Sequence, residues 1–154
     1  MINIPELGNS FSVKLPLTNL TKTTDRGKNS HKRILVVDDE EPIALALKEG
    51  LESLLNCTVT TARDGAIAIK LCKQQIFDLI ITDYKMPVAD GLTLTHQIRQ
   101  IAPQTKIILI SAYIDEHLQQ TALLAGVQRL LQKPFKLEDI RRVASDVLTQ
   151  YPNE

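Results

Sequence analysis

The chain has 154 residues, with 18 basic and 18 acidic side chains and no formal net charge. This length fits one domain with a core of its own, and the charge balance excludes a strongly basic nucleic-acid binder. The two cysteines have neither zinc-site nor redox-pair spacing, so we expect free thiols in a reducing compartment. The apolar runs are far shorter than the roughly 20 residues of a membrane span, so we expect a cytoplasmic protein without membrane insertion.

Residues 1–32 differ in composition from the rest of the chain. The first 33 residues carry six basic and two acidic side chains, and they are rich in Ser, Thr and Asn without a sustained apolar period. This composition predicts a flexible extension. A solvated tail, a docking segment and a transit peptide are the alternatives for its role, and its scarce arginines and two acids argue against the last.

From Arg33 onward, apolar strands alternate with amphipathic helices. Residues 34–37 form a continuous apolar run with β-branched members, which is typical of a strand buried on both faces. The acids that follow, with Pro42 in the first turn, predict a helix that reaches about Leu55. Gly126 is placed to cap a later helix. The same alternation predicts further strands at residues 57–62, 78–83, 106–111 and 130–131, and further helices at residues 65–74, 91–101, 115–125 and 137–149.

Five strand–helix units of this kind predict an α/β fold with a parallel sheet covered by helices on both faces. An eight-stranded barrel needs about 250 residues, so an open, doubly wound, five-stranded sheet is the better choice. A dinucleotide-binding fold is the alternative. Its glycine-rich fingerprint does not follow the first predicted strand, where the turn is acidic instead.

Polar side chains follow four of the five predicted strands: Asp38 and Asp39 the first, Asp83 the third, Ser111 the fourth and Lys133 the fifth. Ligands of open α/β sheets bind at the carboxyl ends of the strands, so we expect these side chains to meet at one edge. Ordinary roles as helix-start acids, a turn acid or a loop lysine explain each residue singly, but not their joint placement. Three carboxylates repel one another unless a divalent cation neutralises them, and oxygen ligands without His or Cys favour Mg²⁺.

Three sequence blocks contain these residues: ILVVDDE at 34–40, DYKMPVADG at 83–91 and KPF at 133–135. In this order, with Ser111 between the last two, they resemble the receiver domain of two-component response regulators. The resemblance covers about residues 32–150. It implies a flavodoxin-like fold with strand order 2-1-3-4-5, and it divides the chain into the extension, a receiver domain at residues 33–150 and a tail at 151–154.

The resemblance also implies the metal site. Asp39 would bind Mg²⁺ directly, and Asp38 would support the ion mainly through water. Asp83 and the backbone carbonyl of Lys85 would complete the protein ligands.

The phosphoryl chemistry follows from the same resemblance. Asp83 would accept a phosphoryl group from a sensor histidine kinase or a phosphotransfer protein. Ser111 would then hydrogen-bond the phosphoryl oxygens, and Lys133 would pair first with the acceptor carboxylate and afterwards with the phosphate. In this family the peptide bond between Lys133 and Pro134 is typically cis.

One position departs from the family pattern. Receiver domains usually carry an aromatic switch residue three positions before the lysine, whereas this chain has Leu130. Tyr113 is a possible substitute, although a rim aromatic with its hydroxyl in water is the simpler interpretation. In this family the residues two positions past the phosphoaspartate and two past the serine flank the approach of water, and here these are Lys85 and Tyr113.

The resemblance therefore predicts a signalling switch that alters partner binding and is not an enzyme, apart from its own phosphorylation and dephosphorylation. Five residues after Thr149 leave no room for an output domain, so a stand-alone regulator without direct DNA binding is expected. A receiver fragment of a larger regulator is one alternative. An Mg²⁺-dependent phosphohydrolase is another, but such enzymes usually have an aspartate where this chain has Lys85.

Overall fold

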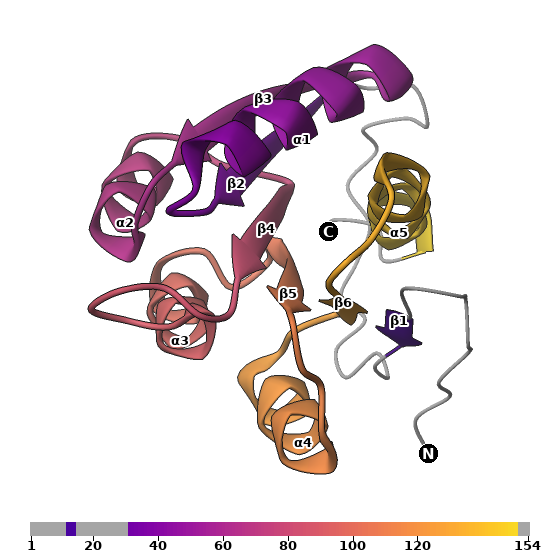
Figure 1. Cartoon of the computed structure of the whole chain (residues 1–154). Helices are drawn as coiled ribbons and strands as arrows, with labels where there is room; N and C mark the ends of the chain where they lie inside the picture. The colour runs from indigo at the N-terminus through magenta and orange to yellow at the C-terminus, as the bar shows by residue number, and fades with distance from the viewer. Residues whose placement is uncertain (1–11, 15–30, 151–154) are drawn as a thin grey trace.

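A six-stranded sheet lies between two layers of helices in the computed structural model, which describes residues 12–14 and 31–150 (Figure 1). The strands are β1 (Ser12–Lys14), β2 (Lys32–Val37), β3 (Cys57–Ala62), β4 (Leu79–Asp83), β5 (Lys106–Ser111) and β6 (Arg129–Gln132). The helices are α1 (Glu41–Leu54), α2 (Gly65–Gln74), α3 (Gly91–Ile101), α4 (Glu116–Ala125) and α5 (Leu137–Gln150). In the described part of the chain, no helix is long and apolar enough to cross a membrane.

The order of the strands across the sheet is β1-β6-β5-β4-β2-β3. The strands β2 to β6 are all parallel to one another. When the five parallel strands β2 to β6 are numbered from one to five in chain order, their order across the sheet is 2-1-3-4-5. This is the flavodoxin-like order, and it confirms the predicted fold class. In this order β2 and β4 are neighbours at the centre, and the strand ends that carry Asp38 and Asp83 are adjacent.

The first strand, β1, was not predicted. It lies within the segment expected to be an extension, and it pairs antiparallel with β6. A strand of three residues is too short to show a period-2 pattern, so it cannot be recognised from the sequence. The other residues of the extension, 1–11 and 15–30, lie outside the described residues, so their expected flexibility stays a prediction.

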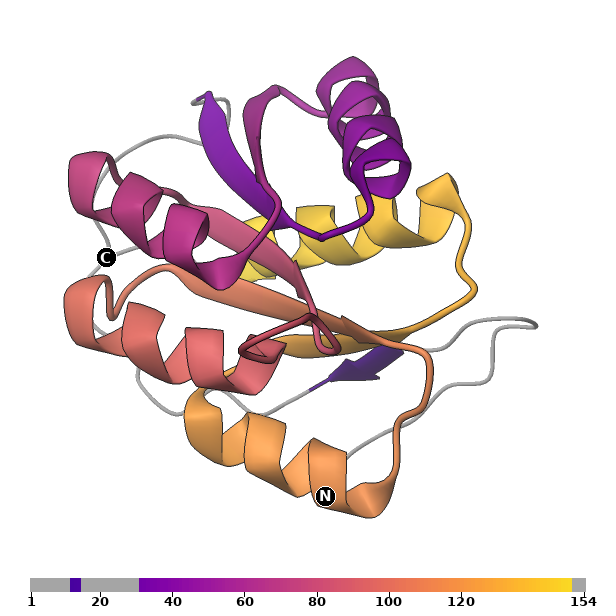
Figure 2. The same ribbon diagram turned by 60° about the vertical axis from the view of Figure 1, so that its left-hand side comes forward.

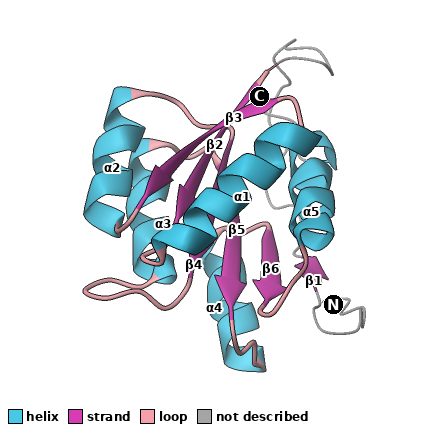
Figure 3. Ribbon diagram, turned by 45° about the horizontal axis from the view of Figure 1, so that its top comes forward, coloured by secondary structure: helices cyan, strands magenta, loops and turns pink. Residues whose placement is uncertain are grey.

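Helices bury both faces of the parallel sheet, as the continuous apolar strands predict. On one face, α1 and α5 pack against side chains such as Ile34 and Leu131. On the other face, α2, α3 and α4 pack against side chains such as Leu35 and Leu130 (Figures 2 and 3). The alternation of Leu130 and Leu131 between the two faces shows that β6 is buried on both sides.

Local signals fix where three of the helices begin. Asp64, Asp90 and Asp115 each accept a hydrogen bond from the backbone N–H three residues on, as helix N-caps do. The C-terminal cap of α4 is Gly126, with φ of 90°, as predicted. This left-handed conformation favours glycine because a side chain would crowd the backbone there.

Both cysteines are free thiols, as predicted. Burial raises the pKa of Cys57, and burial raises the pKa of Cys72 to about 11. The two thiols are therefore protonated at neutral pH and act as core side chains.

Arg99 ties the end of α3 to its surroundings. Its guanidinium donates hydrogen bonds to the carbonyl oxygens of Pro103 at 2.9 Å, Thr105 at 2.5 Å and Gly126 at 2.7 Å. These carbonyls lie in the loop before β5 and at the C-terminal cap of α4. One side chain thus satisfies three backbone acceptors from two separate loops.

We expect Arg99→Met to lower the free energy of unfolding by about 2–4 kcal/mol, because it leaves these partly buried carbonyls without their donor. Urea unfolding followed by circular dichroism measures the loss. The matched control is Arg63→Met, at an exposed arginine in the turn after β3, which should change stability by less than about 0.5 kcal/mol. Equal stability of the two variants would contradict a stabilising role for the hydrogen bonds of Arg99.

Candidate functional site

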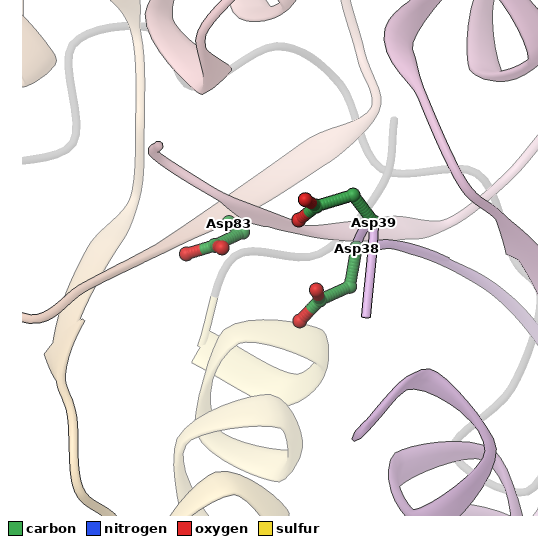
Figure 4. A group of neighbouring side chains, drawn as sticks. All are labelled: Asp38, Asp39 and Asp83. Atoms are coloured by element: carbon green, nitrogen blue, oxygen red, sulfur yellow. The ribbon is translucent and has the colours of Figure 1, made fainter. Parts of the chain in front are cut away.

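Three carboxylates meet where β2 and β4 end (Figure 4). One ligand oxygen from each of Asp38, Asp39 and Asp83 lies within 4.8 Å of the other two. Asp38 and Asp83 are buried, whereas Asp39 is exposed. The structure therefore brings together the three acids that the sequence places at this edge.

The register of the sheet produces this meeting. Val37 pairs with Thr82 in neighbouring parallel strands. The residues that follow them, Asp38 and Asp83, therefore lie side by side at the carboxyl ends of these strands. The Asp38 carboxylate is held in the turn before α1, where its Oδ1 accepts a hydrogen bond of 2.9 Å from the Glu40 N–H.

The start of α3 packs closely on the end of β4. A Cβ at Gly91 would lie 2.6 Å from the carbonyl oxygen of Asp83, so only glycine permits this approach. The Gly91 N–H also donates a hydrogen bond of 2.7 Å to the Tyr84 carbonyl. Gly91 thus fixes the backbone that carries Asp83.

Burial raises the pKa of both Asp38 and Asp83 above the ordinary value for aspartate. The neighbouring acids raise the pKa further, whereas the positive charge of Lys133 acts in the opposite direction on both groups. The Glu40 N–H also favours the charged form of Asp38. Burial is thus the main cause of the net increase, and the repulsion between neighbouring acids adds to it.

Lys133 is the cation in direct contact with the cluster. Its Nζ lies 3.3 Å from Asp83 Oδ2. The Lys133 N–H donates a hydrogen bond of 2.8 Å to the Ser111 carbonyl, which ties the end of β6 to the end of β5. The peptide bond between Lys133 and Pro134 is cis, as the sequence resemblance implies.

The hydroxyl of Ser111 is engaged with the loop between β5 and α4. Ser111 Oγ donates to the Tyr113 carbonyl at 2.8 Å and accepts from the Tyr113 N–H at 3.2 Å. Ser111 itself is buried, while the Tyr113 side chain is 72% exposed. This pair of hydrogen bonds, which the sequence does not reveal, fixes the conformation of the loop.

Leu130 is fully buried and belongs to the core cluster on the α2–α4 face. Leu130 is thus a packing residue at the position where receiver domains usually carry an aromatic switch residue. Tyr113 is an aromatic residue on the exposed rim of the site.

The loop after β4 contains a strained residue that the sequence analysis missed. Val88 has φ of 73° and is fully exposed. This conformation is unfavourable for a β-branched residue. The burial of Met86 and the cap at Asp90 hold the loop on either side of it. Lys85, in the same loop, is exposed at its side chain.

The arrangement fits a hard divalent cation. Three carboxylate oxygens converge without any His or Cys among them. Carboxylate oxygens of this kind are the ligands that such cations prefer in proteins. Asp83, whose carboxylate contacts Lys133, is one of the two buried acids of this cluster.

Comparison with known proteins gives a consistent result over most of the chain. The family model of the response regulator receiver domain matches residues 34–145. The chemotaxis protein CheY of Halobacterium salinarum is 31% identical over 118 residues, which are 77% of this chain and 98% of that protein. The transcriptional regulatory protein PhoP of Bacillus subtilis is 33% identical over 118 residues, and the chain spans about half of its length (49%).

Solved structures show the same likeness. The chemotaxis protein CheY4 of Vibrio cholerae is 27% identical with a TM-score of 0.73, over 77% of this chain and 100% of that one. A CheY-like receiver domain protein of Methanospirillum hungatei is 26% identical with a TM-score of 0.75, over 79% of this chain and 97% of that one. These findings do not favour a phosphohydrolase. The chain belongs to the receiver domain family of two-component response regulators, and it is a phospho-accepting signalling switch rather than a classical enzyme.

Proposed function

We propose that Asp83 accepts the phosphoryl group, that a sensor histidine kinase or a phosphotransfer protein donates it, and that phosphorylation changes the affinity for a downstream protein. The observation that supports this assignment is the contact of 3.3 Å between Lys133 Nζ and Asp83 Oδ2 beside the cluster of carboxylates. Of the three acids, Asp83 combines burial with this direct contact to an ammonium.

In the proposed transfer, the free oxygen of the Asp83 carboxylate attacks phosphorus in line. A P–O bond forms as the P–N bond to the donor histidine breaks, and the imidazole leaves. Lys133 holds the other oxygen during the approach and afterwards pairs with a phosphoryl oxygen, where it acts as a compact positive charge.

We propose Mg²⁺ as the divalent cation. Asp39 and Asp83 would bind it directly, Asp38 mainly through water, and the backbone carbonyl of Lys85 would complete the protein ligands. When bound, Mg²⁺ supplies positive charge that stabilises the developing charge on the phosphoryl oxygens. The convergence of three carboxylate oxygens, with no His or Cys among them, supports this assignment.

The proposed readout begins at Ser111. Its hydroxyl would turn from the Tyr113 carbonyl to a phosphoryl oxygen, and the loop between β5 and α4 would lose one of the two hydrogen bonds that fix it. Because Leu130 replaces the usual aromatic residue, we propose that this loop and the exposed ring of Tyr113 carry the signal to the partner.

The acceptor assignment is tested by incubation with Mg²⁺ and a small acyl phosphate, followed by intact mass measurement and peptide mapping. We expect the wild type to gain one phosphoryl group, and we expect Asp83→Asn to gain none because an amide cannot form the acyl phosphate. Chelation of Mg²⁺ should also abolish labelling. Asp90→Asn, which keeps the N-cap oxygen of α3, is the matched control and should be labelled like the wild type. Undiminished labelling of Asp83→Asn would refute the assignment.

The lifetime of the phosphoprotein tests the surroundings of Asp83. Lys85 and Tyr113 are long or bulky side chains beside the proposed approach of water, so we expect slow autodephosphorylation in the wild type. Replacing both by alanine should speed loss of phosphate several-fold, which corresponds to about 1 kcal/mol in the barrier.

The assay for this effect is phosphate loss from purified phosphoprotein at fixed Mg²⁺ concentration. The control is a double alanine variant at Lys73 and Ile76, which are exposed residues near the end of α2, before β4 begins. It should lose phosphate at the wild-type rate. Decay of the Lys85 and Tyr113 double variant at the wild-type rate or slower would show that these side chains do not restrict water.

A further inference from the structure

Helix α1 contains a glycine in its interior. Gly50 lies four residues before the end of the helix and is buried. Glycine lowers the stability of a helix relative to alanine, because it loses more backbone freedom on folding. A buried glycine in this place therefore indicates that another part of the chain packs closely against the helix backbone.

The neighbour of Gly50 is Leu137, the first residue of α5. A Cβ at Gly50 would collide with both Cδ atoms of Leu137 and would lie 2.9 Å from its Cγ. Because the Cγ is included, rotation of the two methyl groups alone would not relieve the collision. Figures 2 and 3 show α1 and α5 side by side on one face of the sheet. A residue without a Cβ therefore lets Leu137 lie directly on α1.

Leu137 ends a segment of five residues that begins with Lys133, directly after β6. The N–H of Lys133 ties the start of this segment to the end of β5. In its middle, the half-buried Phe135 packs against the core on the α1–α5 face. The Lys136 N–H donates a hydrogen bond of 3.0 Å to Asp139 Oδ2 in the first turn of α5. A segment held at so many points has little freedom, so a displacement of Leu137 is passed on toward Lys133.

We propose that Gly50 is a positioning residue for the phosphoryl transfer. It admits Leu137 to the surface of α1, and this contact sets the place of the Lys133 ammonium beside Asp83. The inference rests on the proposed roles of Asp83 and Lys133. Lys133 Nζ lies 3.3 Å from Asp83 Oδ2, so a displacement of about 1 Å would remove the ammonium from contact and slow the transfer.

The first test measures the rate of phosphorylation by a small acyl phosphate at saturating Mg²⁺. We expect Gly50→Ala to slow labelling at least about fivefold, because the added methyl group displaces Leu137. Gly65→Ala is the matched control. It adds the same methyl group at the start of α2, where the nearest atom of Leu94 would lie at an ordinary contact distance of 3.6 Å, and should be labelled at the wild-type rate. Equal rates in Gly50→Ala and the wild type would overturn the proposal.

The second test approaches the same contact from α5. Leu137→Ala removes the side chain that anchors the segment, so we expect it to slow labelling by itself, and this result does not require Gly50→Ala to fold. Once Leu137 is replaced by alanine, the methyl group of Gly50→Ala no longer meets a leucine. The double variant should therefore be labelled as fast as Leu137→Ala. Equal slowing by Gly50→Ala in both backgrounds would show that it does not act through Leu137.

The affinity for Mg²⁺, measured by titration calorimetry, separates positioning of Lys133 from a general distortion of the site. The three carboxylates follow β2 and β4 and lie outside the segment 133–137. Gly50→Ala should therefore not weaken Mg²⁺ binding, and removal of the Lys133 charge from the cluster should strengthen it. Weaker binding would show that the substitution distorts the carboxylate cluster, and would overturn the positioning role.

Peptide mapping of the labelled proteins keeps this proposal separate from the assignment of the acceptor. A label outside Asp83 in the wild type would refute that assignment. A label on Asp83 that forms at equal rates in the wild type and Gly50→Ala would refute only the positioning role of Gly50.

Discussion

The structure depends on the electrostatic balance at one edge of its sheet. Three carboxylates have oxygens within 4.8 Å of one another, and the described side chain that opposes them directly is the ammonium of Lys133. The register of β2 and β4 enforces this crowding, and the buried apolar strands give the sheet the rigidity to maintain it. Burial raises the pKa values of Asp38 and Asp83, and the neighbouring acids raise them further. An added cation or phosphoryl group therefore changes the balance of charge on which Lys133 and its strand depend.

The parallel sheet and the meeting of the acids could be predicted because they follow from strong, general patterns. Apolar runs mark the strands, and the rule that strand ends gather at one edge brings Asp38 and Asp83 together. The strand at Ser12–Lys14 could not be predicted, since its pairing depends on an open edge of β6 and not on a local pattern. Nor does the sequence reveal that Ser111 bonds to its own loop, or that Val88 has a positive φ, because both depend on packing around them.

Two features of this chain adjoin the ends of β5 and β6. Leu130 is a core residue where a switch aromatic is usual, so the proposed readout passes through Ser111 and the loop of Tyr113. The short strand β1 covers the edge of β6, where it pairs with residues 129–131. The last of these pairs, at Leu131, lies two residues before Lys133. The Lys133 N–H bonds to the Ser111 carbonyl, so the two features are joined through the backbone.

The Mg²⁺ dependence of thermal unfolding, compared between the wild type and Asp38→Asn, tests the charge balance most directly. Because burial raises the pKa of Asp38, its ionised form destabilises the folded protein, so the variant should be more stable than the wild type at pH 7 without metal. This advantage should vanish as the pH falls through the raised pKa, since the wild-type carboxyl becomes neutral, and Mg²⁺ should stabilise the wild type more than the variant. Equal stability without metal at pH 7, with equal responses to Mg²⁺, would contradict the account.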